Sequence, residues 1–261
     1  VNYALRGRDS EKDGKLVRKL AKKYNIPLFV SRPKIKNRAN LENQLRDIRY
    51  AFFEKIRLEN NFDLISVAHN LNDQVETFLM RVIRGAGLQG LSAMKHKNGN
   101  VIRPLLEIKR DEIENYLQKN KLAFRIDKTN LKSKFLRNKI RNKLIPELKK
   151  NYNPQIAKTI FDSTVSISED CDFISLFAKN EFKKNRNLSI KKLLALHKAI
   201  QKRVILEAIA EKKGNLQNVG LANIEEILKM ARSTKNKRQI VLFGELKAVR
   251  IGDKLQIEKV K

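Results

Sequence analysis

The sequence has very little cysteine and no long apolar run. Cys171 is its single cysteine, so the chain can form neither an intramolecular disulfide nor a cysteine-built zinc site. No apolar stretch approaches the ~18 residues that a membrane-spanning helix requires. These absences exclude disulfide-framework and membrane-spanning proteins, and they favour a cytoplasmic protein without a membrane partner.

Acidic residues are also scarce. The chain carries 28 Asp and Glu against 57 Lys and Arg, which gives a formal net charge of +29. So large an excess makes a compact chain repel itself unless it binds polyanions, and nucleic acid is therefore the leading partner. The alternative is a lysine-rich composition that serves solubility alone.

The first half of the chain alternates between helical and strand patterns. Leu64–Ala68 and the short run LFV at 28–30 predict buried strands, and the opening VNYALRG resembles the end of another. Apolar residues recur at helical spacing in four segments: 16–21, 41–52, 72–84 and 109–119. Asn40 is expected to cap the second of these helices. This alternation predicts an α/β fold in which crossover helices cover a parallel sheet.

The composition changes near residue 128. Nine basic residues lie in 128–150 against the single Glu147, and apolar residues recur at helical spacing among them, which predicts a basic amphipathic helix. Asn151–Pro154 marks a boundary, so we expect one domain over 1–150 and a second over 151–261. The second domain is predicted to be mostly helical with a small terminal β element: helices near 155–184, 198–213 and 219–232, then strands at 239–242, 246–251 and 254–260.

The glycine-rich stretch GAGLQG at 85–90 fits the spacing of a dinucleotide-binding fingerprint. That fingerprint must follow a strand and open a helix, whereas this stretch follows the helix that contains Val75 and Phe78. Gly85 is better interpreted as the left-handed residue that ends this helix, and the later glycines as parts of a tight loop.

More informative residues lie just upstream, beyond the end of strand 64–68, where open α/β sheets bind ligands. Asp73 and Glu76 are three residues apart at a helix start, so their side chains are neighbours. A capping box between them is an equally good interpretation from spacing alone. His69 could be an ordinary histidine at a strand end, and Arg81 and Arg84 could be solvated.

Taken together, AHNLNDQVETFLMRVIRGAGLQGLSAM at 68–94 resembles the second signature of tRNA(Ile)-lysidine synthetases, a family of N-type ATP pyrophosphatases. Further family-like stretches follow in the same order: VIRPLLEIKRDEIENYL (101–117), IDKTN (126–130), FLRNKIRNKLIPEL (135–148) and the tail from Arg238. The chain departs from the family pattern at Tyr3, where His is common, and at Asn72, where an acidic residue is usual.

One family element is missing from these 261 residues. The phosphate-binding loop Ser-Gly-Gly-x-Asp-Ser is expected, from the resemblance, to lie before Val1 together with the first strand. The residues that bind the ATP phosphates are therefore not assigned, and the 261-residue chain alone is expected to be inactive. No set of metal ligands is predicted.

The resemblance implies a ligase that attaches L-lysine to the wobble cytidine of tRNA(Ile) with a CAU anticodon. ATP and Mg²⁺ are the implied cofactors, and the base is adenylated before lysine displaces AMP. Asp73 and Glu76 match the positions that hold lysine, and His69 is implied to contact the nucleotide or the reacting base.

The same resemblance implies substrate-binding roles for several basic and polar residues. Asp127 is expected to order the loop before the basic helix, whose alternative interpretation is a solvated face. The expected substrate-binding residues are Arg81, Arg84, Arg103, Arg137, Asn138 and Arg141. The region 151–261 is expected to bind tRNA.

Two rival functions remain open. A sister class thiolates tRNA bases with paired cysteines or a cluster, and Cys171 alone cannot form a catalytic disulfide. The other rival is a tRNA-binding protein without catalytic activity.

Overall fold

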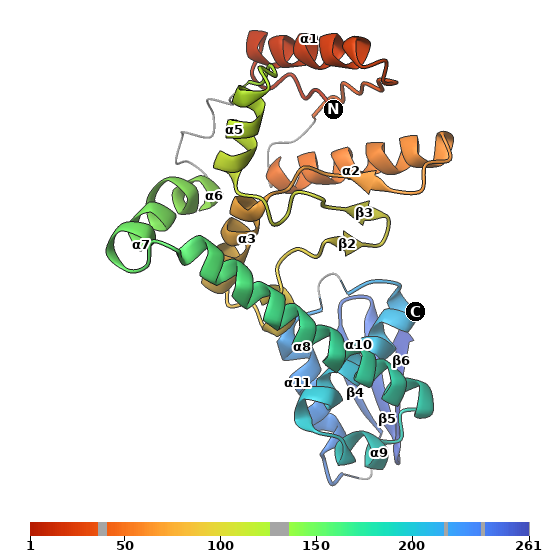
Figure 1. Ribbon diagram of the computed structural model, residues 1–261. Coiled ribbons are helices and arrows are strands. Elements are labelled where there is room, and N and C mark those ends of the chain that lie inside the picture. The colour runs from red at the N-terminus through yellow and green to blue at the C-terminus, as the bar shows by residue number, and fades with distance from the viewer. Residues whose placement is uncertain (36–40, 126–135, 217–218, 236–237, 261) are drawn as a thin grey trace. The chain divides into compact units, whose positions relative to one another are not determined.

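The structure is a computed structural model that describes residues 1–35, 41–125, 136–216, 219–235 and 238–260. The chain divides into two compact units, Val1–Val165 and Ser166–Lys261 (Figure 1). Helix α8, Ile156–Lys184, contributes residues to both. The predicted boundary at Asn151–Pro154 stays a prediction, and Asn40, Asp127 and the segment 128–135 lie outside the described residues.

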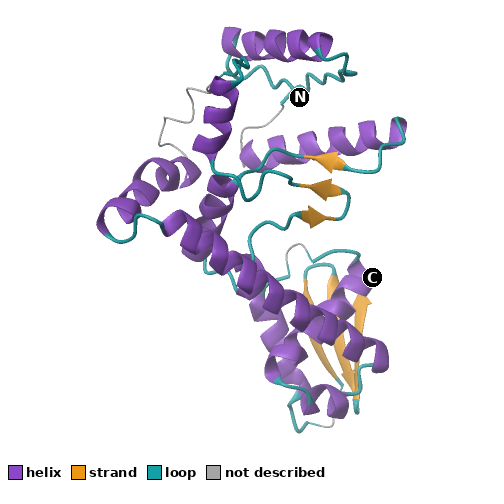
Figure 2. Cartoon of the chain, viewed as in Figure 1, coloured by secondary structure: helices purple, strands orange, loops and turns teal. Residues whose placement is uncertain are grey.

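The first unit is mainly helical, with one small sheet (Figure 2). The helices predicted near 16–21, 41–52, 72–84 and 109–119 are present in it. Its helices are α1 (Arg8–Lys23), α2 (Leu41–Glu59), α3 (Leu71–Ile83), α4 (Leu88–Leu91), α5 (Arg110–Lys119), α6 (Leu136–Lys139) and α7 (Ile145–Asn151), with a π-helical turn, η2 (Ile140–Leu144).

The sheet of this unit has the strand order β1-β3-β2. The predicted strand at 64–68 appears as β1, Ile65–Ser66, which pairs in parallel with β3, Val101–Ile102. A two-residue turn joins β3 to β2, Lys97–Asn98, in an antiparallel pair. The described part of the chain thus contains one parallel pair rather than the predicted parallel sheet.

Two predicted strands are absent from the described residues. The run 28–30 forms no strand, and its three apolar side chains are between 38% and 50% exposed. The opening stretch 1–7 touches this region through one backbone hydrogen bond, from the Asn2 amide to the Ser31 carbonyl at 2.9 Å. An apolar run specifies burial, but a strand also needs a ladder of hydrogen bonds, which these segments lack.

A compact apolar core fixes α3 in place. Leu71 and Val75, on one face of α3, pack with Leu106, Ile140, Ile145, Ile160 and Phe161. Val75, Leu106 and Ile140 are each only 1% exposed, and burial of such side chains stabilises a fold by about 1.5–3 kcal/mol each. This packing holds the π-helical turn against α3 and so determines which side chains meet there.

The basic helix predicted over 128–150 is not a regular α-helix in its described part. It runs as α6, then η2, then α7, and the Ile145 amide bonds to the Ile140 carbonyl across the wider turn. Pro146 explains the irregularity, because its ring lacks an N–H and would crowd the carbonyl four residues earlier in a regular helix.

The second unit combines helices with a three-stranded antiparallel sheet. The helices predicted near 155–184, 198–213 and 219–232 and the three terminal strands are present. The elements are the second part of α8, α9 (Ile190–Ala195), α10 (Lys198–Lys213), α11 (Leu221–Ala231), β4 (Gln239–Phe243), β5 (Leu246–Ile251) and β6 (Lys254–Lys259). α9 was missed because it is only six residues long.

The core of the second unit lies between the helices and one face of the sheet. Ile205, Ile209, Ile227 and Leu228, from α10 and α11, have no exposed surface. The strand order is β4-β5-β6, and Gly252 turns the chain between the last two strands with a φ of 57°. Among the described residues, none of the helices combines the length and the apolar character that a membrane span needs.

Candidate active site

The candidate site begins where the chain leaves β1 and enters α3. Asn70 is the N-cap of α3: its side chain accepts from the Asp73 amide at 3.0 Å, and its own amide donates to Asp73 Oδ2 at 3.1 Å. The capping box therefore pairs Asn70 with Asp73, one turn earlier than the box considered from the sequence. Glu76 takes no part in capping.

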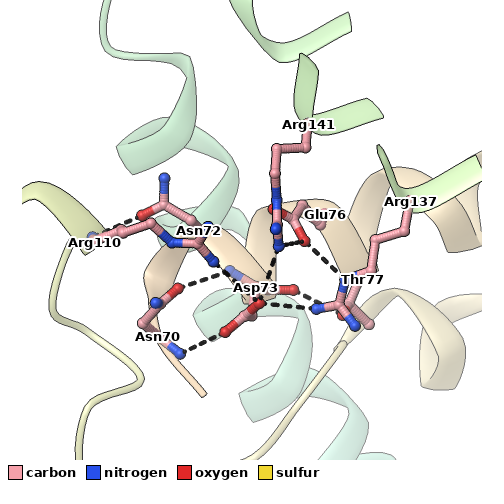
Figure 3. Close-up of polar contacts among 8 residues, drawn as sticks. All are labelled: Asn70, Asn72, Asp73, Glu76, Thr77, Arg110, Arg137 and Arg141. Atoms are coloured by element: carbon pink, nitrogen blue, oxygen red, sulfur yellow. Dashed lines mark hydrogen bonds and ion pairs between the residues drawn. The ribbon is translucent and has the colours of Figure 1, made fainter. Parts of the chain in front are cut away.

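Arginines surround the two carboxylates (Figure 3). Arg137 donates to Glu76 Oε2 at 2.8 Å and to Asp73 Oδ1 at 3.0 Å. Arg141 donates to both oxygens of Glu76, at 2.6 and 2.8 Å, and its Nη2 lies 3.6 Å from Asp73 Oδ1. We call Asp73, Glu76, Arg110, Arg137 and Arg141 the acid–arginine cluster.

Burial makes these ion pairs important. Glu76 is 1% exposed and lies beside Val75 of the apolar core, so its charge would be costly without the two guanidinium partners. Burial opposes the charged form of Arg137, but its hydrogen bond to Glu76 and the nearby charge of Asp73 outweigh this and raise its pKa. The charges of the cluster thus compensate one another. An incoming cation or anion could replace one of the present partners.

The sequence interpretation missed Arg110. Its Nη2 lies 3.8 Å from Asp73 Oδ1, and its amide donates to the Asn72 side chain at 2.9 Å. The second contact joins the start of α5 to the start of α3. No local spacing could have indicated this, because the residues are 38 positions apart.

His69 lies between β1 and α3, close to the cluster. Burial lowers its pKa from 6.5 to about 4, and the charges of Arg103, Arg137 and Arg46 add to this while Asp73 opposes it. Nδ1 of His69 is buried and has no hydrogen-bond partner among the described residues. At neutral pH the ring is therefore an uncharged imidazole with an unused polar atom.

Three other arginines expected to bind substrate have different environments. Arg81 donates to the carbonyls of Gly90 and Ala93, the latter at 2.9 Å. Arg103 is 5% exposed and donates to the Lys95 carbonyl at 2.8 Å, while its Nε is buried without a partner in the described structure. Both hold the loop after α3, whereas Arg84 is exposed at the end of that helix. Their substrate-binding roles stay predictions.

The glycine-rich stretch ends α3 as predicted. Gly85 has a φ of 72°, the left-handed conformation of a helix-ending glycine. The remainder is not only a loop, because Leu88–Leu91 form the short helix α4. Gly90 is required there, since a Cβ at this position would lie 2.6 Å from the Cβ of Ala86.

A mainly apolar hollow of about 580 Å³ adjoins the cluster. Arg137 and Asn138 line it together with residues of the opening stretch, α1, the run 28–30 and the start of α2. Arg137 thus reaches both the hollow and the two carboxylates. In the described part of the chain, no group of three His, Cys, Asp or Glu side chains could hold a metal ion.

Known proteins resemble this chain over most of its length. A protein named tRNA(Ile)-lysidine synthase from Clostridium tetani is 38% identical over 95% of this chain and 56% of its own length. Its namesake from Caldanaerobacter subterraneus subsp. tengcongensis is 32% identical over 100% of this chain and 58% of its own length. The chain therefore spans little more than half the length of these curated relatives.

The chain is also similar to one solved structure and matches one family model. A U34-tRNA thiolase from Methanococcus maripaludis aligns with a TM-score of 0.49 at 19% identity, over 61% of this chain and 57% of that chain. The family model described as the PP-loop domain matches residues 1–148, which is more than half of the chain. The chain therefore belongs to the PP-loop domain family.

Proposed function

We propose that this protein ligates L-lysine to the wobble cytidine of tRNA(Ile) with a CAU anticodon, using ATP. The observation that carries the proposal is the pair of the partly buried Asp73 and the buried Glu76, compensated by arginines beyond the end of β1, in a chain 38% identical to a protein named tRNA(Ile)-lysidine synthase. Carboxylates in this setting suit a substrate with a cationic amine.

The proposed reaction has two steps. The carbonyl oxygen of the cytosine attacks the α-phosphate of ATP, a P–O bond breaks, and pyrophosphate leaves. The ε-amine of lysine then attacks the activated carbon of the base, AMP leaves with its oxygen, and the amine loses protons to give lysidine. The reference pKa of lysine is ~10.4, so the site must first hold an ammonium and later accept a proton from it.

We assign the first of these tasks to Asp73 and Glu76. Both carboxylates are occupied by guanidinium groups, so an ammonium must compete with Arg137 and Arg141 for them. The phosphates of ATP and the RNA offer those arginines alternative anions, which guanidinium groups bind in bidentate geometry. Exchange of partners would free the carboxylates for lysine, without leaving any of the charges unpaired.

We assign His69 a contact with the nucleotide or the reacting base. Its lowered pKa keeps the ring neutral, so the ring can accept a hydrogen bond or a proton. Its unpartnered Nδ1 supports a contact with a polar ligand. We further propose that the adenosine of ATP lies in the hollow where Arg137 and Asn138 form part of the wall.

The described residues do not provide Mg²⁺ with a site of its own. The carboxylates of Asp73 and Glu76 already accept from arginines, and no third acidic ligand accompanies them among the residues described. We therefore propose that Mg²⁺ enters with the ATP phosphates, as this hard cation commonly does, and we assign no step to it.

The rival functions receive less support. Thiolation would need paired cysteines or a cluster, whereas Cys171 is the single cysteine of the chain and is only 3% exposed. A tRNA-binding protein without catalytic activity would need no pair of compensated carboxylates whose partner, Arg137, lines a hollow. Arg141 and the described basic residues of α6 and α7 are consistent with either kind of tRNA binder.

The test is an assay of the full-length protein with ATP, labelled lysine and a tRNA(Ile) transcript that carries the CAU anticodon. We expect label to enter the transcript, AMP to form only when both lysine and transcript are present, and a transcript with U at the wobble position to be inert. Tight binding of the transcript without incorporation of lysine would instead identify the binding-only rival.

A further inference from the structure

A second hollow, of about 550 Å³, lies entirely within the second unit. It is formed where the end of α8 and the loop before α9 meet the turn between β5 and β6. We call it the basic hollow, and its basic lining residues are Lys183, Lys184, Arg186, Lys192 and Lys254. Asp253 is its single acidic lining residue, and none of these residues has been given an individual role within the region expected to bind tRNA.

Hydrogen bonds hold the walls of the basic hollow together. Asp253 accepts from the Ser189 hydroxyl at 2.6 Å and from the Lys191 amide at 2.8 Å. The Ile190 amide donates to the Asp253 carbonyl at 2.7 Å, and the Leu255 amide to the Leu188 carbonyl at 3.1 Å. These bonds join the loop before α9 to the β5–β6 turn, so the lysines project from a fixed backbone.

The charges around the basic hollow are only partly compensated. Arg186 pairs with Glu211 at 2.8 Å, and Lys184 pairs with Glu181 at 2.8 Å. Lys183, Lys192 and Lys254 are exposed and form no ion pair with any described carboxylate. The carboxylate of Asp253 is already used by a hydroxyl and an amide, whose hydrogen bonds lower its pKa. A net positive recess therefore faces solvent.

We propose that the basic hollow binds the phosphate backbone of the tRNA substrate, with Lys183, Lys192 and Lys254 as its phosphate ligands. This inference rests on the proposed function for the identity of the RNA. Ammonium groups on flexible stems bind phosphates as point charges and need no particular base sequence. The hollow thus supplies affinity and position, while reading of the anticodon belongs to other residues.

The shape and surroundings of the basic hollow favour RNA over an anionic membrane. A membrane-binding surface needs an apolar face that enters the bilayer next to its basic residues. Here the one large apolar side chain in the lining is Ile251, 50% exposed, and the lysines surround a recess that can receive a projecting phosphate. The net charge of +29 further favours a long polyanion.

The test measures the binding of a fluorescent tRNA(Ile) transcript to the full-length protein between 50 and 300 mM KCl. The test variant is Lys183→Ala/Lys192→Ala/Lys254→Ala, and the matched control is Lys179→Ala/Lys212→Ala/Lys229→Ala, which removes three exposed lysines outside the hollow. All six side chains are exposed, so urea midpoints should match the unmodified protein.

We expect the test variant to raise Kd by about 10- to 30-fold at 150 mM KCl. The slope of log K against log salt should fall by about two to three, since each lost phosphate contact removes about 0.7–0.9. The control should change Kd by less than about threefold. The proposal would be overturned if the test and control variants had equal Kd values and equal slopes. It would also be overturned if the test variant lost binding to phosphatidylglycerol vesicles while its binding to RNA stayed intact.

Lysine incorporation separates this proposal from the proposed function. If the unmodified protein binds transcript but incorporates no lysine, the proposed function fails, and the salt slopes still decide whether the hollow binds RNA. If lysine is incorporated while the test variant keeps full affinity and slope, the hollow proposal fails alone. If both the proposed function and the hollow proposal hold, a saturating concentration of transcript should restore lysine incorporation by the test variant to within about twofold of that by the unmodified protein.

Discussion

The acid–arginine cluster and the basic hollow use charge in opposite ways. In the cluster, Glu76 is 1% exposed and every carboxylate oxygen near it has a guanidinium or amide partner. In the basic hollow, three lysines are exposed without a described ion pair, and Asp253 is used by local donors. Compensated buried charges hold structure and can exchange partners, whereas uncompensated exposed charges attract a polyanion from solution.

The largest expected effect comes from breaking the compensation in the cluster. Glu76→Gln leaves Arg137 and Arg141 with Asp73 as their one described carboxylate partner. Loss of a buried partner costs about 3–5 kcal/mol, and the 27% and 19% exposure of the two arginines reduces this to about 2–4 kcal/mol. Urea denaturation followed by circular dichroism measures the change in unfolding free energy.

The matched control for this substitution is Glu211→Gln. Glu211 pairs with Arg186 at 2.8 Å, but the side chains are 40% and 71% exposed. Surface pairs contribute little, so a change below about 0.5 kcal/mol is expected. Equal effects of the two substitutions would show that burial does not distinguish the cluster from surface ion pairs.

The second prediction concerns lysine. In Asp73→Asn the amide oxygen can still accept from the Asn70 amide, so the cap is kept while the charge is lost. A charged hydrogen bond to the ammonium contributes about 1.5–3 kcal/mol, so the KM for lysine should rise roughly tenfold or more. Affinity for the transcript should change less than twofold, because its phosphate contacts are retained.

Steady-state assays at varied lysine concentration, with binding measured separately, test this prediction. Asp111→Asn is the control, since Asp111 is exposed in the first turn of α5. A KM for lysine that stays normal in the Asp73 variant would remove this carboxylate from the proposed lysine site.

These two substitutions also show what the sequence could predict. The adjacency of Asp73 and Glu76 followed from helical geometry, because residues three apart share a face. The partners of Glu76 could not be predicted in this way. Arg137 and Arg141 lie 61 and 65 residues away, and they meet Glu76 only because the π-helical turn packs on α3. Glu76→Gln, expected from the sequence to affect lysine binding, is therefore also expected to destabilise the fold.

The same distinction applies to the fold. Helices such as α1 and α3 were predicted because the spacing of their apolar residues is a local feature. The strand at 64–68 was recognised, but its pairing with β3 was not. Val101–Ile102 is too short to show the alternating pattern that identifies a strand. The run 28–30 shows the reverse error, since apolar residues alone do not supply a partner strand.

A third, smaller effect concerns pH. An unfolded histidine ionises near 6.5, whereas His69 stays neutral until about pH 4 because burial disfavours its charged form. Its contribution to stability is therefore complete above pH 6.5 and is lost as the pH falls from 6.5 towards 4. Partial exposure of the ring limits the loss between pH 7 and 5 to about 1 kcal/mol.

Urea midpoints at pH 7 and pH 5 for the unmodified protein, His69→Asn and His197→Asn test this expectation. The loss on acidification should shrink only in the His69 variant, because His197 is an exposed N-cap residue. An undiminished loss in the His69 variant would mean that other groups carry the pH dependence, and that the site does not impose a neutral ring.

The smallest expected effect sharpens the contrast from the side of the basic hollow. Asp253→Asn removes a carboxylate, as Glu76→Gln does, but here the side chain is exposed and bonded to the Ser189 hydroxyl and the Lys191 amide. An asparagine oxygen can keep one of these bonds, so the urea midpoint should move far less than in the Glu76 variant.

With one negative charge gone beside Lys183, Lys192 and Lys254, affinity for the transcript should rise by about twofold at 50 mM KCl and converge with that of the unmodified protein at 300 mM, because salt screens exposed charges. Weaker binding in this variant would mean that Asp253 positions the RNA ligands through the backbone it holds, and that fixed geometry contributes more to the basic hollow than its net charge.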